Sequence, residues 1–121
     1  MAVRVLVVDD ETSVLRLVSI VLSNEGYEVH TASDPYQALE IVKYAGRTFD
    51  VLLTDVIMPQ MCGPELVRHI KRTTPDIAVV LMSAEMGAQT LPEGVGFVSK
   101  PFAIKDLSAV VARMIPLSSC R

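Results

Sequence analysis

Residues 3–10 read Val-Arg-Val-Leu-Val-Val-Asp-Asp, a short apolar run that ends in two carboxylates. A run of this length, rich in β-branched side chains, is typical of a strand buried on both faces of a parallel sheet. Ligands and reactive groups gather beyond the carboxyl ends of such strands. We therefore expect Asp9 and Asp10 to lie at the functional edge of an α/β fold.

Two more charged residues follow apolar runs further along the chain. Asp55 comes directly after residues 51–54, and Lys100 comes shortly after residues 95–98. If these runs are parallel strands of one sheet, three carboxylates and one ammonium group converge at the same edge. Carboxylates at such short distances repel one another, and the repulsion raises the pKa of at least one of them. A hard divalent cation such as Mg²⁺ relieves the repulsion. The pattern predicts a metal site beside a reactive aspartate.

The rest of the chain alternates strand-like runs with amphipathic segments. We expect strands at residues 3–8, 27–31, 51–54, 77–82 and 95–98, and helices at about 13–25, 35–45, 64–72 and 103–114. Gly26 is placed to end the first helix, and Ser33 or Asp34 to cap the second, with Pro35 at its first position. This alternation predicts an α/β fold with a doubly wound, five-stranded parallel sheet and right-handed crossovers.

The connection between the fourth and fifth strands is unusually short. It holds Gly87, Pro92 and Gly94, which limit any helix there to one or two turns. We therefore expect the fourth helix of the series to be shortened or missing.

Length and composition set further limits. The chain has 121 residues, half of them hydrophobic, and a formal net charge of −3, so we expect residues 1–121 to form a single domain. No uncharged stretch is long enough to cross a bilayer, and no signal peptide opens the chain, so we expect a cytoplasmic protein without membrane insertion. The acidic balance gives no electrostatic reason to bind nucleic acid directly.

Four short motifs together resemble the receiver domain of two-component response regulators, including the receivers of hybrid histidine kinases. The motifs are Asp9-Asp10-Glu11, Thr54-Asp55 followed by Met58-Pro59 and Gly63, Met82-Ser83-Ala84, and Lys100-Pro101-Phe102. The resemblance implies a flavodoxin-like, CheY-like (βα)5 fold that takes a phosphoryl group from a histidine kinase or a histidine phosphotransfer protein. It implies a signalling module that promotes only its own aspartyl phosphorylation and dephosphorylation, rather than an enzyme.

The same resemblance assigns roles to individual residues. Asp55 is the expected phosphoacceptor and also a Mg²⁺ ligand. Asp10 is expected to bind the ion directly, Asp9 through water, and Ile57 through its backbone carbonyl. Lys100 is expected to pair with Asp55 and then with phosphoryl oxygens, where a positive charge stabilises the transferring group. Its bond to the following proline is expected to be cis.

Other positions are expected to switch or tune the site. Ser83 matches the hydroxyl that reorients toward the phosphoryl group, and Phe97 the aromatic that turns inward with it. Ile57 and Glu85 occupy the two positions that control access of water to the phosphoaspartate. Glu11 can add charge, but we expect it mainly to begin the first helix, where the helix dipole favours an acidic side chain.

Several alternatives stay open. A shortened fourth helix suggests output through another face, or a phosphorelay in which transfer is itself the output, and a homodimer is compatible with the sequence. A flavin-binding electron carrier would need a phosphate loop after the first strand, and an aspartyl phosphatase would have Asp-x-Asp there. A receiver-like docking module without phosphoryl turnover is the remaining alternative.

Overall fold

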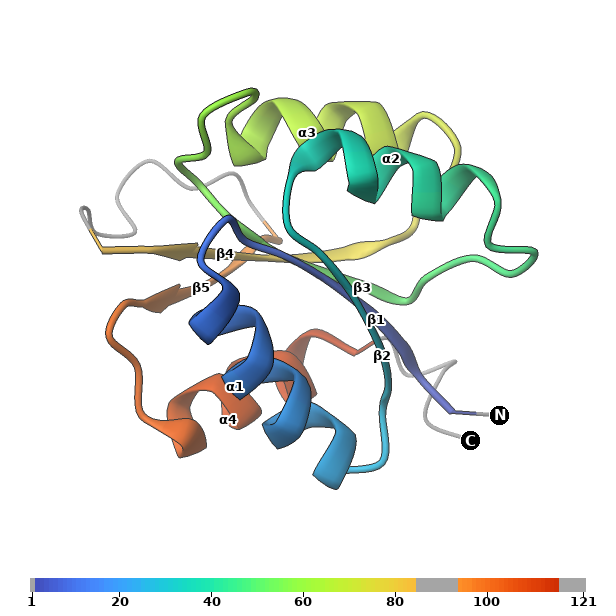
Figure 1. Ribbon diagram of the computed structural model, residues 1–121. Coiled ribbons are helices and arrows are strands. Elements are labelled where there is room, and N and C mark those ends of the chain that lie inside the picture. Colours follow the sequence, from blue (N-terminus) through green and yellow to red (C-terminus); the bar gives the residue numbers. More distant parts are fainter. Residues whose placement is uncertain (1, 85–93, 116–121) are drawn as a thin grey trace.

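The computed structural model describes residues 2–84 and 94–115, which form a five-stranded parallel sheet between two layers of helices (Figure 1). The strand order is β2-β1-β3-β4-β5, and every neighbouring pair is parallel. The chain adds β2 on one side of β1 and then β3, β4 and β5 on the other side. The boundary between β1 and β3 is therefore the switch point of a flavodoxin-like, doubly wound sheet. The predicted fold class is confirmed.

The elements lie where the apolar pattern predicts them. The strands are β1 (Arg4–Val8), β2 (Glu28–Ala32), β3 (Val51–Asp55), β4 (Ala78–Ser83) and β5 (Gly96–Ser99). The helices are α1 (Thr12–Asn24), α2 (Pro35–Lys43), α3 (Gly63–Lys71) and α4 (Ile104–Met114). Their ends differ from the predicted ends by one or two residues, which is the usual uncertainty at frayed termini.

The shortened helix predicted between β4 and β5 falls on residues 85–93, outside the described residues. The label α4 therefore belongs to the helix that follows β5. None of the described helices has the length and apolar character needed to cross a bilayer.

Two apolar cores hold the layers together, one on each face of the sheet. Along β1, Val5 and Val7 point to the core shared with α1 and α4, whereas Leu6 and Val8 point to the core shared with α2 and α3. All four side chains are fully buried, and burial of each contributes about 1.5–3 kcal/mol. This two-sided burial fixes the register of β1 and so the position of the residues that follow it.

Local signals at the helix ends act as predicted. Asp34 is the residue that caps α2, because its Oδ1 accepts a hydrogen bond from the Gln37 N–H at 2.8 Å. Pro35 takes the first helical position. Gly26, just after α1, has φ of 93°, a conformation that residues with a Cβ rarely adopt.

Candidate functional site

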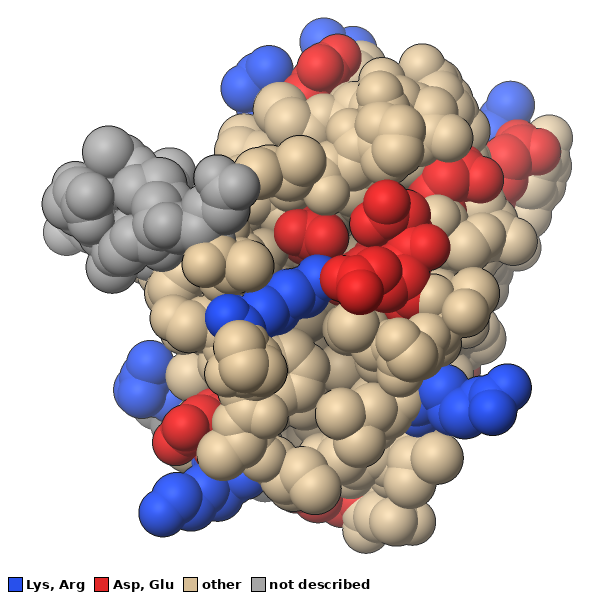
Figure 2. Space-filling view, turned by 60° about the vertical axis from the view of Figure 1, so that its left-hand side comes forward, with Lys and Arg blue, Asp and Glu red and all other residues tan. Residues whose placement is uncertain are grey.

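A pocket of charged side chains lies beyond the carboxyl ends of the strands. Asp9 follows β1, Asp55 ends β3 and Lys100 follows β5. The strands are parallel, so all of these residues come to the same edge of the sheet. Figure 2 shows acidic side chains gathered beside a basic one on this side of the molecule. The structure therefore brings Asp9, Asp55 and Lys100 together.

The ammonium group of Lys100 joins three carboxylates. Its Nζ lies 2.7 Å from Asp9 Oδ2, 3.0 Å from Asp55 Oδ2 and 3.3 Å from Glu11 Oε1. The shortest contact is an ion pair rather than a well-aligned hydrogen bond, because Asp9 Oδ2 meets no donor at a favourable angle among the described residues. Burial alone lowers the pKa of Lys100, but the contacts with Asp9 and Asp55 outweigh burial and raise it. Lys100 therefore carries its charge at neutral pH.

Asp9 is the most deeply placed carboxylate of the pocket, with 0% of the residue exposed. Its Oδ1 accepts a hydrogen bond from the Glu11 N–H at 2.9 Å. Burial raises the pKa of Asp9, although the contact with Lys100 and the Glu11 N–H act in the opposite direction. The sequence pattern predicted such a rise from repulsion between carboxylates. The charge of Asp55 does contribute, but burial is the larger cause.

The loop after β3 fixes the surroundings of Asp55. The Ile57 N–H donates to Asp55 Oδ1 at 3.3 Å, and the Gly63 N–H donates to the Val56 carbonyl at 2.7 Å. A side chain at Gly63 would collide with the backbone oxygen of Asp55. Only glycine allows the loop to fold back this tightly against the end of β3, which accounts for the glycine that closes the Met58-Pro59 motif.

The predicted switch residues lie on the two strands next to Asp55. Ser83 ends β4 and is buried, and its carbonyl accepts the Lys100 N–H at 2.9 Å. Phe97 is half-buried in β5 and packs against the core below α2 and α3. The Lys100–Pro101 bond is cis, as expected. Glu85, the second expected tuning residue, lies outside the described residues.

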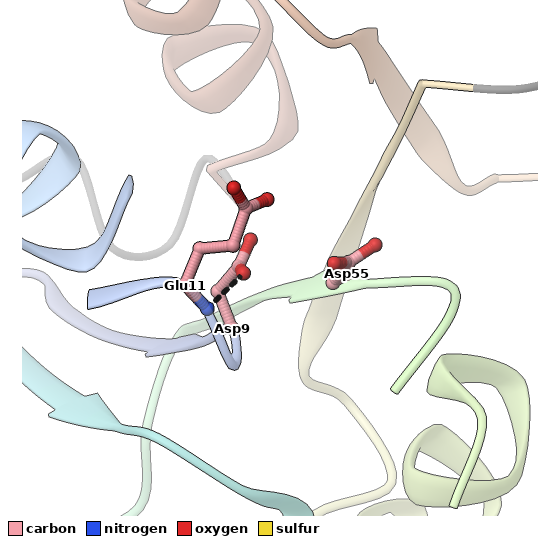
Figure 3. A group of neighbouring side chains, drawn as sticks. All are labelled: Asp9, Glu11 and Asp55. Carbon is pink, nitrogen blue, oxygen red and sulfur yellow. Dashed lines mark hydrogen bonds between the residues drawn. The ribbon is translucent and has the colours of Figure 1, made fainter. Parts of the chain in front are cut away.

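The carboxylates of the pocket are suited to a metal ion. Asp9, Glu11 and Asp55 each offer an oxygen atom, and these atoms lie within 4.8 Å of one another (Figure 3). Three carboxylates share a single ammonium group, so negative charge is in excess, and an all-oxygen donor set suits a hard divalent cation. Asp10, the expected direct ligand, is exposed and outside this group. Ile57 lies at the rim, with 58% of the residue exposed.

Glu11 was expected mainly to begin the first helix and also able to add charge to the site, and the structure shows both. Its backbone begins α1 as expected, because its carbonyl accepts the N–H groups of Val14 and Leu15. Its side chain, however, makes no capping hydrogen bond and contacts Lys100 instead. The available signal was its place as the third consecutive acidic residue after the first strand.

Comparison with known proteins gives a consistent result. Residues 5–112 match the response regulator receiver domain family. The chain is 38% identical over 116 residues to the sensor kinase CckA of Brucella abortus, a match that covers 92% of this chain and 12% of that protein. It superposes on the chemotaxis protein CheY4 of Vibrio cholerae with a TM-score of 0.86 and 30% identity, covering 95% of this chain and 100% of that one.

A further structure is of similar size and shape. The receiver domain of the hybrid histidine kinase CckA superposes with a TM-score of 0.82 and 34% identity, covering 93% of this chain and 99% of that one. The curated relatives are longer proteins, of which the chain spans from 12% to about half. The family match, the sheet order and the acidic pocket with its lysine agree: the chain belongs to the response regulator receiver domain family of two-component systems.

Proposed function

We propose that Asp55 accepts a phosphoryl group from the phosphohistidine of a histidine kinase or a histidine phosphotransfer protein. The observation that carries the proposal is the 3.0 Å contact between Lys100 Nζ and Asp55 Oδ2 at the end of β3. Asp9 contacts the same ammonium group but is sealed from solvent. The Asp55 side chain is 11% exposed, so a donor can reach it.

The transfer needs one nucleophile and a positive charge beside it. A carboxylate oxygen of Asp55 attacks the phosphorus atom, and the bond between phosphorus and the imidazole nitrogen breaks. That nitrogen keeps the electron pair and takes up a proton, and Asp55 becomes an acyl phosphate. The ammonium group of Lys100 stabilises the negative charge on the phosphoryl oxygens during the transfer.

We propose that the domain holds Mg²⁺ through Asp9, Asp10, Asp55 and the backbone carbonyl of Ile57. When bound, the ion neutralises part of the excess negative charge and polarises the phosphoryl oxygens. Asp10 is exposed, so its side chain can turn toward the pocket without disturbing the core. Asp9 is held in place by the Glu11 N–H and Lys100.

Phosphorylation then has to be reported to a partner. We propose that Ser83 donates its hydroxyl to a phosphoryl oxygen and that Phe97, on the adjacent strand β5, changes its burial in response. Protein partners rather than nucleic acid fit the net charge of −3. The proposal places the domain in the cytoplasm, as a single unit of residues 1–121 that is compatible with a homodimer or with a role in a phosphorelay.

A small phosphoryl donor tests the pocket without the native kinase. Incubation with acetyl phosphate and Mg²⁺ should add about 80 Da to the intact mass, one phosphoryl group on a carboxylate. The gain should require Mg²⁺ and disappear in Asp55→Asn. Asp50→Asn is the matched control, because Asp50 lies just before β3, at the other end of the strand, and should leave the gain unchanged. No gain in the wild type with either acetyl phosphate or phosphoramidate would favour the docking module instead.

A further inference from the structure

Three carboxylates compete for the single ammonium group of Lys100. Lys100 Nζ donates hydrogen bonds to Asp55 Oδ2 at 3.0 Å and to Glu11 Oε1 at 3.3 Å, and it forms an ion pair with Asp9 Oδ2 at 2.7 Å. A phosphoryl group that arrives at Asp55 brings further negative charge to the same ammonium group. It therefore competes with the carboxylates that Lys100 already contacts.

Glu11 is the partner that can leave most easily. Its contact with Lys100 is the longest of the three, and its side chain is 60% exposed, compared with 0% for Asp9 and 11% for Asp55. The Glu11 side chain makes no capping hydrogen bond to α1, so α1 does not hold it in place. Figure 3 shows it extending from the start of α1 beside Asp9. Among residues 2–84 and 94–115, its movement would break only the contact with Lys100.

The charge of Glu11 also lies where a donor has to approach. Glu11 contributes an oxygen within 4.8 Å of those of Asp9 and Asp55, and it is the solvent-facing member of the group. An anionic donor that approaches Asp55 from solvent therefore meets this carboxylate as well as Lys100. Repulsion between like charges grows in proportion to the charge of the donor.

We propose that Glu11 is a selectivity residue that discriminates phosphoryl donors by charge. It accepts a hydrogen bond from Lys100 in the unphosphorylated state and repels dianionic donors more than monoanionic ones. The inference rests on the proposed phosphorylation of Asp55. Asp9 and Asp55 are needed for the site itself, whereas Glu11 modulates which donors react.

Two small donors with different charges test this directly. At pH 7 acetyl phosphate is mainly a dianion and phosphoramidate a monoanion. Glu11→Gln should speed phosphorylation about twofold with phosphoramidate and about fourfold with acetyl phosphate, because the repulsive energy doubles with the charge and a solvent-exposed charge acts weakly. Glu11→Asp keeps the negative charge and should react more like the wild type. Raising the salt concentration should bring the two ratios together through screening.

The controls separate this effect from others. Glu40→Gln makes the same change in net charge on the exposed face of α2 and should not change either rate. Each variant is measured at a Mg²⁺ concentration that saturates it, established by following backbone amide NMR signals during a Mg²⁺ titration. This titration also reports directly on whether Glu11 affects Mg²⁺ affinity.

The outcomes are distinct. A larger acceleration with acetyl phosphate than with phosphoramidate, absent in Glu40→Gln, supports the proposal. Equal acceleration with both donors, no acceleration, or a change in Mg²⁺ affinity with unchanged rates at saturation would overturn it. A wild type that gains no phosphoryl group from either donor would instead refute the proposed function.

Discussion

A largely enclosed cation lies at each end of the strands, and the two differ in how their charge is balanced: the Lys100 side chain is 12% exposed and the Arg4 side chain 6%. At the carboxyl edge, Lys100 faces three carboxylates. At the opposite edge, Arg4 begins β1 with its side chain 6% exposed. Arg4 Nε donates to Glu28 Oε2 at 2.9 Å and its Nη1 to the Arg47 carbonyl at 2.6 Å. Its guanidinium also lies over the Phe49 ring, 4.4 Å from the centroid.

The difference distinguishes a structural cluster from a reactive one. Among the described residues, the Arg4 guanidinium pairs with one carboxylate, that of Glu28, and otherwise contacts carbonyl oxygens and an aromatic face. Its positive charge is therefore balanced by a single negative charge. The single positive charge of Lys100 faces three negative charges, so the cluster has an excess of negative charge. A metal ion or a change of partner must relieve this excess. We therefore expect substitutions at Arg4 to change stability and substitutions at Lys100 to change phosphoryl transfer.

The largest effect is expected at Lys100. Lys100→Met keeps an unbranched side chain of similar length but removes the charge beside Asp55. Phosphorylation by acetyl phosphate at saturating Mg²⁺ should slow at least about 100-fold, the usual cost of losing one group that stabilises the transition state. Intact-mass time courses measure this rate. Lys43→Met, an exposed lysine in α2, is the control, and a rate of Lys100→Met near that of the control would remove Lys100 from the mechanism.

Arg4→Met should lower the stability of the fold and leave the rate of phosphoryl transfer nearly unchanged. The change removes charged hydrogen bonds to Glu28 and to the Arg47 carbonyl, so the free energy of unfolding should fall by about 2–4 kcal/mol. Denaturant titration measures it. The phosphorylation rate under native conditions should stay within about twofold of the wild type, since coupling between distant sites is weak. Arg16→Met, an exposed arginine in α1, should change stability by about 0.5 kcal/mol or less. A slower transfer in Arg4→Met with unchanged stability would contradict the distinction between the two edges.

The two edges should also respond differently to acid. Hydrogen bonds from His30 and Arg4 lower the pKa of Glu28 from 4.5 to about 2. Glu28 therefore contributes stability above pH 4.5 that is lost as the pH falls toward 2. The pKa of Asp9 is raised, so its contribution is present at low pH and is lost as the pH rises through its folded pKa. On acidification, the wild type should lose stability relative to Glu28→Gln. It should gain stability relative to Asp9→Asn. Parallel shifts in both variants would contradict these assignments.

The smallest effect is expected at the rim of the pocket. Ile57 is 58% exposed beside Asp55, and its apolar side chain should hinder a water molecule from reaching the acyl phosphate in line. Ile57→Asn should shorten the half-life of the phosphorylated domain by about two- to fivefold, as expected for one weak polar contact to the attacking water. Loss of the added mass after removal of the donor measures it. Ile20→Asn alters an isoleucine of similar exposure, 54%, in α1, and an equal change in both variants would show that position 57 has no special role.

Much of this arrangement could be predicted because it depends on local pattern and chain direction. The apolar runs give the strands, parallel direction places Asp9, Asp55 and Lys100 at one edge, and Asp34 and Gly26 mark helix ends. Two features could not be predicted from the sequence. The turn of Glu11 toward Lys100 depends on packing between residues 89 positions apart. The Arg4 cluster joins β1, β2 and the segment before β3, although a single charge inside an apolar run was a signal of buried partners.

The most direct test locates the phosphoryl group. The domain phosphorylated by acetyl phosphate in the presence of Mg²⁺ is reduced with borohydride, which converts an aspartyl phosphate to homoserine, and is then cleaved and sequenced by mass spectrometry. We predict homoserine at position 55 alone. Homoserine at position 9 or 10, or the corresponding reduced residue at position 11, would show that another carboxylate of the pocket is the acceptor and would contradict the central role of Asp55.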